Sequence, residues 1–391
     1  MFRHWHIHRP HYFSKHLSKQ IEELYVSVAI MDFALAAMGF FAPIYLYNIG
    51  YPLWQIMLFY LSGYLLYFFL IPFGGQYVGR YGYEKSMMIA SLALAGHYLL
   101  LFIIPSWPAA FWLAVLLFAV QKMFFWPAYH ADFGKYSYRN DRGSQVSGLV
   151  ALDQTVFIFG PLIGGIIIKF LGFPVLFGVA ILLILLSNVP IFMTTEKIKQ
   201  IRFAYKDSLA YLTDKKRRSQ LVAYLGFGEE IVSWIVWPIF IFLIVKDYFS
   251  IGFIVAGASL ITVLITLYVG KLFDRGQKNK MIGFSTILYS LSGLGRIFTG
   301  SSGGVFVFDS MQKFFKNGLY VPILAGLYEK TKPGKDLLLQ GIFYEQALSL
   351  GKIFVALLIM LIALFTDGYL AAFVIGAGVS LLYLFILRTE Q

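Results

Sequence analysis

Ionisable side chains lie inside long apolar runs of this chain, where they are rare and costly. A charged side chain at the centre of a membrane helix costs about 2.5–3.5 kcal/mol, so such groups normally face a partner or a wet cavity. A carboxylate that is desolvated in one state and paired with a lysine in another can take up and release a proton. The candidates for proton coupling or for lining a substrate cavity are Asp32, Lys122, Trp126, Tyr129, Asp153, Glu229, Glu230, Trp237, Asp309, Lys313, Lys316, Glu345 and Lys352.

Three ionisable groups of the first half lie at one depth. Asp32, Lys122 and Asp153 are each about eight or nine residues from the inner end of their apolar run. At 1.5 Å per residue, this is within about 15 Å of that boundary. The pattern predicts an Asp–Lys–Asp cluster. Alternatively, the charges only pair and hold helices together, because opposite charges nearly balance.

A second set of ionisable groups in the other half echoes the first. We expect its carboxylates to lie near Lys313, and they are Glu229, Glu230 and Glu345. Helical spacing places two trios on one face each, namely Asp309, Lys313 and Lys316, and Glu345, Ser349 and Lys352. Both faces are expected to point inward.

Arginine and histidine residues add weaker signals. Arg296 lies near the outer end of its run and can extend to the interface, so we interpret it as structural. His97 and His130 are each isolated, which favours packed or pore-facing histidines over metal ligands. The N-terminal tail is expected to be disordered, although its histidines could hold a transition metal loosely; they are His4, His6, His8, His11 and His16.

The elements that must position these groups are membrane spans. Of 391 residues, 59% are hydrophobic and only 13% charged, whereas soluble domains carry about 25% charged residues. The absence of cysteine excludes disulfides and cysteine-based metal or redox sites. We predict an all-α membrane protein with twelve transmembrane helices at roughly 23–47, 53–78, 86–104, 107–131, 145–168, 173–193, 220–245, 250–270, 281–299, 304–327, 338–364 and 367–388.

The distribution of lysine and arginine predicts the topology. The connections on one side carry 25 of these residues and those on the other side carry two. By the positive-inside rule both termini are cytoplasmic, and the net charge of +12 requires no nucleic-acid partner. The predicted organisation is a cytoplasmic tail, a six-helix bundle, a cytoplasmic linker and a second six-helix bundle with a short cytoplasmic tail, at 1–22, 23–193, 194–219 and 220–391.

The linker has apolar residues at helical spacing, which are Ile198, Ile201, Tyr205 and Leu209. This pattern is typical of a helix that lies along the inner leaflet, with the basic run 215–218 at anionic headgroups. The alternative is a charge run that only fixes topology.

Three landmarks recur between the two halves. The segment 75–80 is echoed by 270–275, Gln121–Phe125 by Gln312–Phe315, and Asp153–Gln154 by Glu345–Gln346, at offsets of 195, 191 and 192. Such spacing indicates two parallel six-helix repeats with a substrate site at the midplane between them.

On these motifs the chain resembles the major facilitator superfamily over essentially its whole length. The family's signature G-x-x-x-D-R-x-G-R-R/K is similar to the segment after the second span, except that Gly79 stands where the acid is expected. The resemblance implies that this motif and its second copy brace the cytoplasmic helix ends. The gating residues it implies are Gly75, Arg80, Gly82, Gly270, Asp274 and Arg275. It also implies that spans 1, 4, 7 and 10 surround the central cavity.

A further motif in the fifth span resembles the GPxxGG segment of the family's drug antiporters. It consists of Gly160, Pro161, Gly164 and Gly165, but Val156 stands where that pattern has another glycine. The alternative interpretation is that these residues only let two helices approach closely.

These observations predict a secondary active transporter of a small organic solute that works by alternating access, is coupled to protons and exports by antiport. Uptake by symport and a non-transporting membrane scaffold or sensor are the alternatives. Asp32 is ranked first as the proton site because Ala and Gly surround it on a helix expected to line the cavity.

The sequence contains no enzyme motif in the structural context that the motif requires. The sequence has no G-x-x-x-x-G-K-[ST] or HExxH motif, and Gly300–Gly304, which satisfies G-x-S-x-G, lies in a short turn without a preceding strand. We therefore expect no enzyme activity and no cofactor. The expected partners are a small-molecule substrate, protons and membrane lipids, without nucleic acid, for a monomer in the cell membrane.

Overall fold

The computed structural model describes residues 19–136, 142–191, 200–273, 278–329, 331 and 334–389. Within these ranges the chain is helical and contains no strand. The histidines of the N-terminal tail and the predicted gating residues Asp274 and Arg275 lie outside the described residues, and so does the side chain of Asp153.

The first half consists of long apolar helices. They are α1 (Lys19–Ala34), α2 (Ala42–Asn48), α3 (Leu53–Tyr81), α4 (Tyr83–Ile103), α5 (Ala110–Tyr136), α6 (Arg142–Leu186) and α7 (Asn188–Ile191). A π-helical stretch, Leu35–Gly39, joins α1 to α2, so the two form one apolar span.

The linker and the second half follow the same plan. Their helices are α8 (Tyr205–Thr213), α9 (Arg218–Leu225), α10 (Trp237–Val245), α11 (Tyr248–Phe273), α12 (Lys278–Gly295), α13 (Ser302–Glu329), α14 (Lys335–Ala363) and α15 (Tyr369–Ser380). A short 3-10 stretch, Gly226–Glu229, and a π-helical stretch, Val232–Val236, interrupt the span that runs from α9 to α10.

The described chain is consistent with twelve membrane spans. Nine of its helical stretches are long and apolar enough to cross a membrane. One of these, Thr155–Pro190, breaks at Gly172, whose φ of +81° is favourable only for glycine, and thereby supplies two spans. The helices α11 and α13 supply two more. The predicted all-α membrane fold is confirmed.

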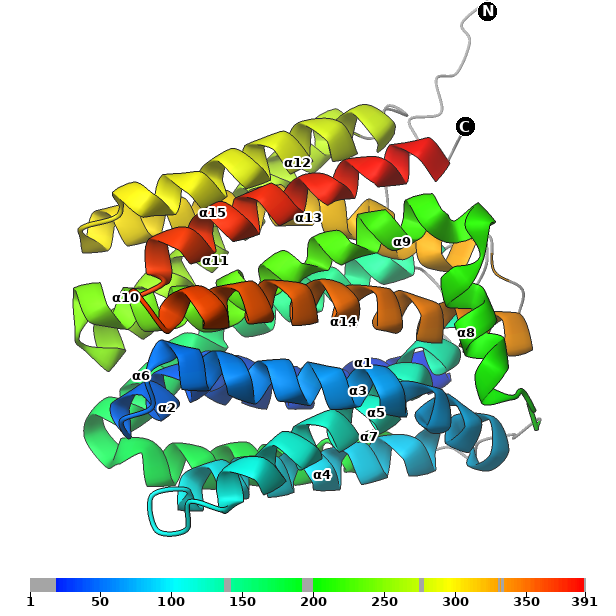
Figure 1. Cartoon of the computed structure of the whole chain (residues 1–391), viewed down its shortest axis with the longest axis horizontal. Coiled ribbons are helices and arrows are strands. Elements are labelled where there is room, and N and C mark those ends of the chain that lie inside the picture. The colour runs from blue at the N-terminus through cyan, green and yellow to red at the C-terminus, as the bar shows by residue number, and fades with distance from the viewer. Residues whose placement is uncertain are drawn as a thin grey trace, which may run out of the picture.

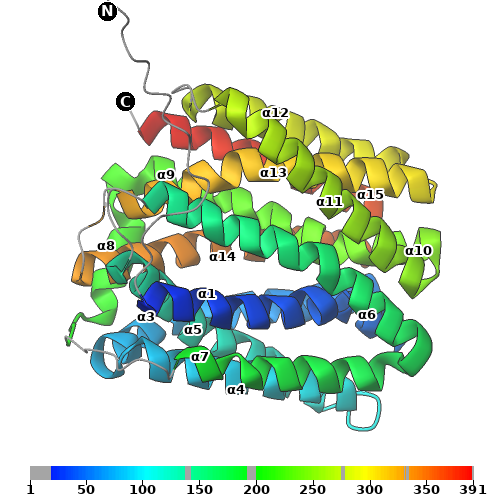
Figure 2. The same cartoon turned by 180° about the vertical axis from the view of Figure 1, so that it is seen from behind.

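The two halves meet mainly along two helix pairs. In Figures 1 and 2 the linker helices α8 and α9 lie at one end of the bundle, here called the linker end, and α2 and α10 lie at the opposite end. The helix α3 runs beside α14, where the side-chain amide of Gln346 donates to the Phe68 carbonyl at 3.4 Å. The helix α6 runs beside α11, where a Cβ on Gly252 would lie 2.3 Å from the carbonyl oxygen of Pro161.

The linker packs on protein, which corrects part of the expectation that its apolar face lies on the membrane. The Ile201 N–H donates to the Gly79 carbonyl at 2.8 Å, and the Tyr205 hydroxyl donates to the Phe69 carbonyl at 3.2 Å, so both residues face α3. Only Leu209 is exposed among the described members of that face. One reason is that α3 offers the Gly79 carbonyl in its last turn, which the N–H of the linker can bind and a lipid chain cannot.

The linker also contacts the second half. The Tyr211 hydroxyl donates to Asp336 at 2.6 Å, and burial beside that carboxylate raises the pKa of Tyr211 to about 12. Lys335 donates to Asp207 at 2.7 Å and lowers the pKa of that carboxyl. The linker therefore ties the end of α3 to the start of α14.

Candidate functional site

A cavity lies between the two halves. Helices α3 and α5 form one wall, and α13, α14 and the start of the span that leads into α10 form the other. Its lining residues are Tyr64, Tyr67, Lys122, Trp126, Tyr129, His130, Phe227, Glu230, Tyr320, Leu324, Tyr344, Glu345, Leu348 and Lys352. The cavity offers about 70 Å³ to the centres of water-sized molecules, which is room for a few waters. A larger solute would require the halves to separate.

A buried contact between a histidine and a glutamate crosses this cavity from one half to the other. His130 Nε2 on α5 lies 3.0 Å from Glu345 Oε1 on α14, and both side chains are almost fully buried at 2% and 3% exposed. The Tyr67 hydroxyl on α3 donates to the second carboxylate oxygen at 2.9 Å. The imidazole also stacks on Trp126, with ring centroids 5.8 Å apart. Glu345 therefore joins the halves through two first-half side chains.

A second cluster of charges belongs to the second half. Lys352 Nζ lies 2.8 Å from Glu230 Oε2, and Lys316 Nζ lies 3.2 Å from Glu230 Oε1. Lys316 also binds Glu229, which accepts a hydrogen bond from the Tyr383 hydroxyl at 3.2 Å. The chain of contacts runs from the central cavity into the interior of the second bundle.

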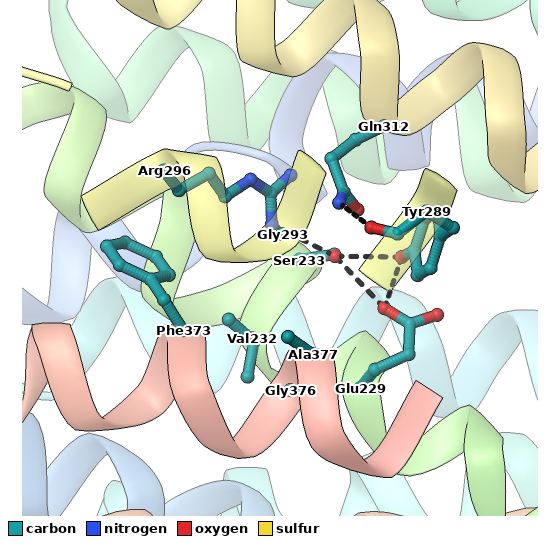
Figure 3. A pocket seen from close by; sticks show the side chains of 10 residues that line it. All are labelled: Glu229, Val232, Ser233, Tyr289, Gly293, Arg296, Gln312, Phe373, Gly376 and Ala377. Carbon is teal, nitrogen blue, oxygen red and sulfur yellow. Dashed lines mark hydrogen bonds between the residues drawn. The ribbon is translucent and has the colours of Figure 1, made fainter. Parts of the chain in front are cut away.

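Figure 3 shows a small pocket inside the second bundle, here called the hollow, where this charge cluster ends at Glu229. Glu229 accepts hydrogen bonds there from Ser233 at 3.1 Å and from the Tyr289 hydroxyl. Arg296 donates to Ser233 at 3.3 Å and lies over the Trp237 ring, with 4.3 Å from its guanidinium carbon to the ring centroid. The hollow holds about one water, with about 10 Å³ for water-sized centres.

Lys122 differs from these lysines in its surroundings. Its ammonium lies 4.9 Å from the centroid of the Phe118 ring, 5.6 Å from that of Tyr64 and 6.0 Å from that of Trp126. Among the described residues, no carboxylate lies within 4 Å of it. Within the described chain, Lys122 therefore makes cation–π contacts, and it lines the cavity.

The structure corrects the partners expected for Lys313. Lys313 pairs with Asp309 at 2.6 Å and donates to Ser259 at 3.0 Å, away from the cavity. Lys316 holds Glu229 and Glu230 in its place. Three helical residues rotate a side chain by about 300°, so adjacent positions of one predicted face reach different neighbours.

The expected interfacial position of Arg296 is wrong, because Arg296 is only 3% exposed and lies inside the second bundle. The expected location of Glu345 near Lys313 is wrong as well. Glu345 binds His130 of the opposite half instead. Neither error could be avoided from spacing within one helix, because each partner lies on another helix.

The remaining candidates lie at different places. Trp126 and Tyr129 line the cavity. Trp237 is buried in the second half, where its indole N–H donates to Asp309 at 3.0 Å. Asp32 is half-buried on α1, has contacts of its own and does not line this cavity.

The comparisons with known proteins agree with this architecture. The family model described as Major Facilitator Superfamily matches residues 24–208. The crystal structure of the human organic anion transporter MFSD10 (TETRAN) superposes with a TM-score of 0.69 over 95% of this chain and 100% of that chain, at 16% identity. The first half of the chain therefore matches the model of the major facilitator superfamily, and the whole chain shares the fold of this transporter. Its helical fold is that of solved membrane transporters.

Two further solved structures share this fold. The major facilitator superfamily transporter FucP in its outward conformation has a TM-score of 0.67 at 13% identity, and covers 96% of this chain and 100% of that chain. A variant of the E. coli fucose:proton symporter FucP has a TM-score of 0.65 at 13% identity, with 96% and 99% covered. No curated protein sequence matches this chain.

The first copy of the superfamily's signature motif lies at the linker end. Gly82 ends α3 with a φ of +94°, and the Arg80 guanidinium carbon lies 5.0 Å from the Tyr81 ring centroid. A Cβ at Gly75 would lie 2.5 Å from the Ile342 side chain of α14. Gly270 lies within α11, and its motif partners lie outside the described residues.

The linker explains why glycine replaces the motif's acid at position 79. A Cβ there would lie 2.4 Å from the Ile201 carbonyl oxygen, which is backbone and cannot rotate away. The Gly79 carbonyl accepts the Ile201 N–H. The linker backbone thus occupies the place where an acidic side chain would start.

We predict that Gly79→Asp, which restores the superfamily's acid, lowers the transport rate at least about fivefold. Any Cβ at this position must push the Ile201 backbone from α3. Gly79→Ala is the matched variant, because it adds the Cβ without the acid. Transport in proteoliposomes and protease sensitivity of the linker are the measurements. A faster rate for the Asp variant than for the unmodified protein would contradict the prediction.

The glycines of the fifth-span motif make close backbone approaches. A Cβ on Gly160 or Gly164 would lie 2.4 Å from Ala36 or from the Ala37 carbonyl oxygen of the first span. A Cβ on Gly165 would lie 2.4 Å from the Tyr248 carbonyl oxygen of the second half. Pro161 lies beside Gly252 where α6 packs against α11. This geometry favours the close-packing interpretation of the motif.

Sequence reasoning missed several residues of the site. His130 was expected to be an isolated histidine, and tyrosines were not considered as partners of the charges. The missed residues that line the cavity or bind its charges are Tyr64, Tyr67, His130, Tyr289, Tyr344 and Tyr383. The chain has 26 tyrosines, so no single one stood out. The three-residue spacing of Tyr64 and Tyr67 is the only available signal.

Proposed function

We propose that this protein is a proton-coupled secondary active transporter of a small organic solute that works by alternating access. The observation that carries the proposal is the buried pair of His130 and Glu345, which joins the two halves at the cavity. Histidine changes its charge near physiological pH, and a carboxylate changes its preferred state when it loses a cationic partner. Separation of the halves would break this pair and so change its affinity for a proton.

Contacts at both ends of the cavity supply the two gates of such a cycle. At the opposite end, Lys169 lies 3.1 Å from Asp247, and Asn48 donates to the Tyr248 hydroxyl at 2.6 Å. At the linker end, α3 meets α14 at Gly75. Rocking of the halves can release one set of contacts while it keeps the other.

The direction of coupling has two candidates. The partial resemblance of the fifth span to drug antiporters supports export by antiport. Lys122, which has no carboxylate within 4 Å among the described side chains, supports the alternative, cotransport of a proton with an anionic solute, because a proton and an anion together leave the cavity charge unchanged. Two of the proteins that share this fold are an organic anion transporter and a fucose:proton symporter. A membrane scaffold without transport would show neither antiport nor symport.

The experiment is a solute screen in proteoliposomes with an internal pH-sensitive dye. Unlabelled solutes of each charge class are added under an imposed pH gradient, and protein-free vesicles are the control. Solute-dependent proton movement into the vesicle with the solute indicates symport, and movement against it indicates antiport. Solute flux without any proton movement would refute coupling, and no flux for any class would favour the scaffold.

We also propose that the linker end faces the cytoplasm in the cell membrane, as the lysine and arginine asymmetry supports. Ala210 is exposed on the linker, and the chain has no native cysteine. A cysteine at Ala210 should be labelled by an impermeant reagent only after cell lysis. Labelling in intact cells to the extent found for a cysteine at Ser106, at the opposite end, would reverse the orientation.

A further inference from the structure

We propose that the central cavity binds a small aromatic monocarboxylate, with the carboxylate on the Lys122 ammonium and the ring among the cavity's aromatic side chains. This inference rests on the proposed transport function, whose solute class it names.

The first argument is the contrast between Lys122 and the other intramembrane lysines. Lys313, Lys316 and Lys352 each have a carboxylate within 3.2 Å. Within the described chain, Lys122 has ring faces instead, although it too lies inside a span. An intramembrane ammonium normally faces a partner or a wet cavity. A cation that faces a cavity without its own anion has a place for a ligand's anion.

The second argument is the balance of charge around the cavity. Lys352 is neutralised by Glu230, and His130 with Glu345 is neutral when the pair shares one proton. Among the described side chains that line the cavity, Lys122 then leaves an excess of one positive charge, and one negative charge on the solute balances it. A dianion would leave it with an excess negative charge.

The third argument is the chemistry of the walls. Seven of the fourteen lining residues have phenyl, phenol or indole rings, and they come from both halves. The Tyr64 ring lies between two ammonium groups, with its centroid 5.6 Å from Lys122 Nζ and 5.0 Å from Lys352 Nζ. Edge-to-face and offset contacts of aromatic pairs favour a flat ring in such a site.

A consequence for coupling follows from the same charge balance. The groups that face the His130–Glu345 pair around the cavity are Tyr67 from α3, Trp126 and Tyr129 from α5, Tyr320 from α13, Tyr344 and Lys352 from α14, and Glu230. When the pair loses its proton, the excess positive charge disappears and the carboxylate loses its balance. Carboxylate and proton should therefore bind together, which makes symport the direction for this solute class.

The test compares 3-phenylpropionate with its neutral amide, 3-phenylpropionamide, and with the cation 3-phenylpropylamine. Calorimetric titration of the purified full-length protein at pH 6 is expected to give a dissociation constant at least about tenfold lower for the acid than for the amide. Equal affinities for acid and amide in the unmodified protein would overturn the inference without any variant. Preferential binding of the amine would overturn it as well.

Lys122→Met should remove the preference for the acid, and Lys122→Arg should keep part of it. Lys206→Met, which removes the same charge from the exposed linker, should leave the preference unchanged. A preference that persists in Lys122→Met would place the carboxylate elsewhere and overturn the assignment. If Lys122→Met does not yield folded protein, the Arg variant and the acid–amide comparison decide.

The inference and the proposed function can fail separately. Acid-selective binding without proton-coupled flux would refute the transporter and keep the site. Proton-coupled flux of amines or neutral solutes, with no binding of the acid, would keep the transporter and refute the site.

Discussion

Replacement of Glu345 by glutamine is expected to abolish accumulation driven by a pH gradient while solute exchange between the two sides stays within about twofold of the unmodified rate. Glutamine can still accept the Tyr67 hydrogen bond and contact His130, so the cavity keeps its shape. It cannot bind or release the proton that couples the halves. Accumulation and exchange of the best solute from the screen, measured in the same proteoliposomes, separate the two effects.

The matched control for this prediction is Glu22→Gln, the same chemical change at an exposed position of α1. It should leave both rates unchanged. Glu230→Gln is the contrasting variant, because it would strand Lys352 and weaken the hold on Lys316. Breaking a buried pair on one side costs about 3–5 kcal/mol, so this variant should lose folded protein rather than coupling alone. Full accumulation by Glu345→Gln would remove this residue from the coupling mechanism.

Gly165→Val is expected to lower the transport rate at least about tenfold and to leave the opposite end of the cavity open. The added Cβ would lie 2.4 Å from the Tyr248 carbonyl oxygen, where α6 meets α11, and this contact consists of backbone that cannot yield. Closure of that end is therefore prevented, and the halves stay apart there. Labelling of a cysteine at Tyr64 from the opposite end should rise in this variant, and transport should fall.

Gly178→Val is a matched control for helix propensity, since Gly178 lies in the span of α6 that follows the break at Gly172 and a Cβ there meets no atom within 4 Å. Its transport rate and labelling should match those of the unmodified protein. Similar losses in both variants would mean that the valine itself disturbs α6, and the contact would no longer explain the effect.

The fold was largely predictable because each membrane span must satisfy its own backbone within hydrocarbon. Span positions therefore depend on local apolar length, and the break at Gly172 agrees with the predicted gap between the fifth and sixth spans. The span that corresponds to α13 was predictable although it carries Asp309, Lys313 and Lys316, because the residues around these charges are apolar. The repeat of Gln121–Phe125 in Gln312–Phe315 predicted the two-half architecture, because both segments can be compared along the sequence without knowledge of their contacts.

The candidate site was predictable in some of its charged members but not in its tyrosines or in its pairs. Lys122, Glu230, Glu345 and Lys352 all line the cavity, as expected of ionisable groups that cannot face lipid. Asp32, which the sequence ranked first, does not line it. Depth along a span is readable from residue number, whereas rotation about the helix axis and the identity of the facing helix are not.

The sequence by itself determined which segments cross the membrane, that the chain has two related halves, and which side chains must find polar surroundings. Tertiary structure alone decided that Glu345 meets His130 across the cavity, that Lys316 rather than Lys313 holds Glu229, and that the linker covers Gly79. The physical reason is range. Span formation satisfies hydrogen bonds between residues four apart, whereas an ion pair between α5 and α14 joins atoms that are 215 residues apart and depends on how both bundles pack.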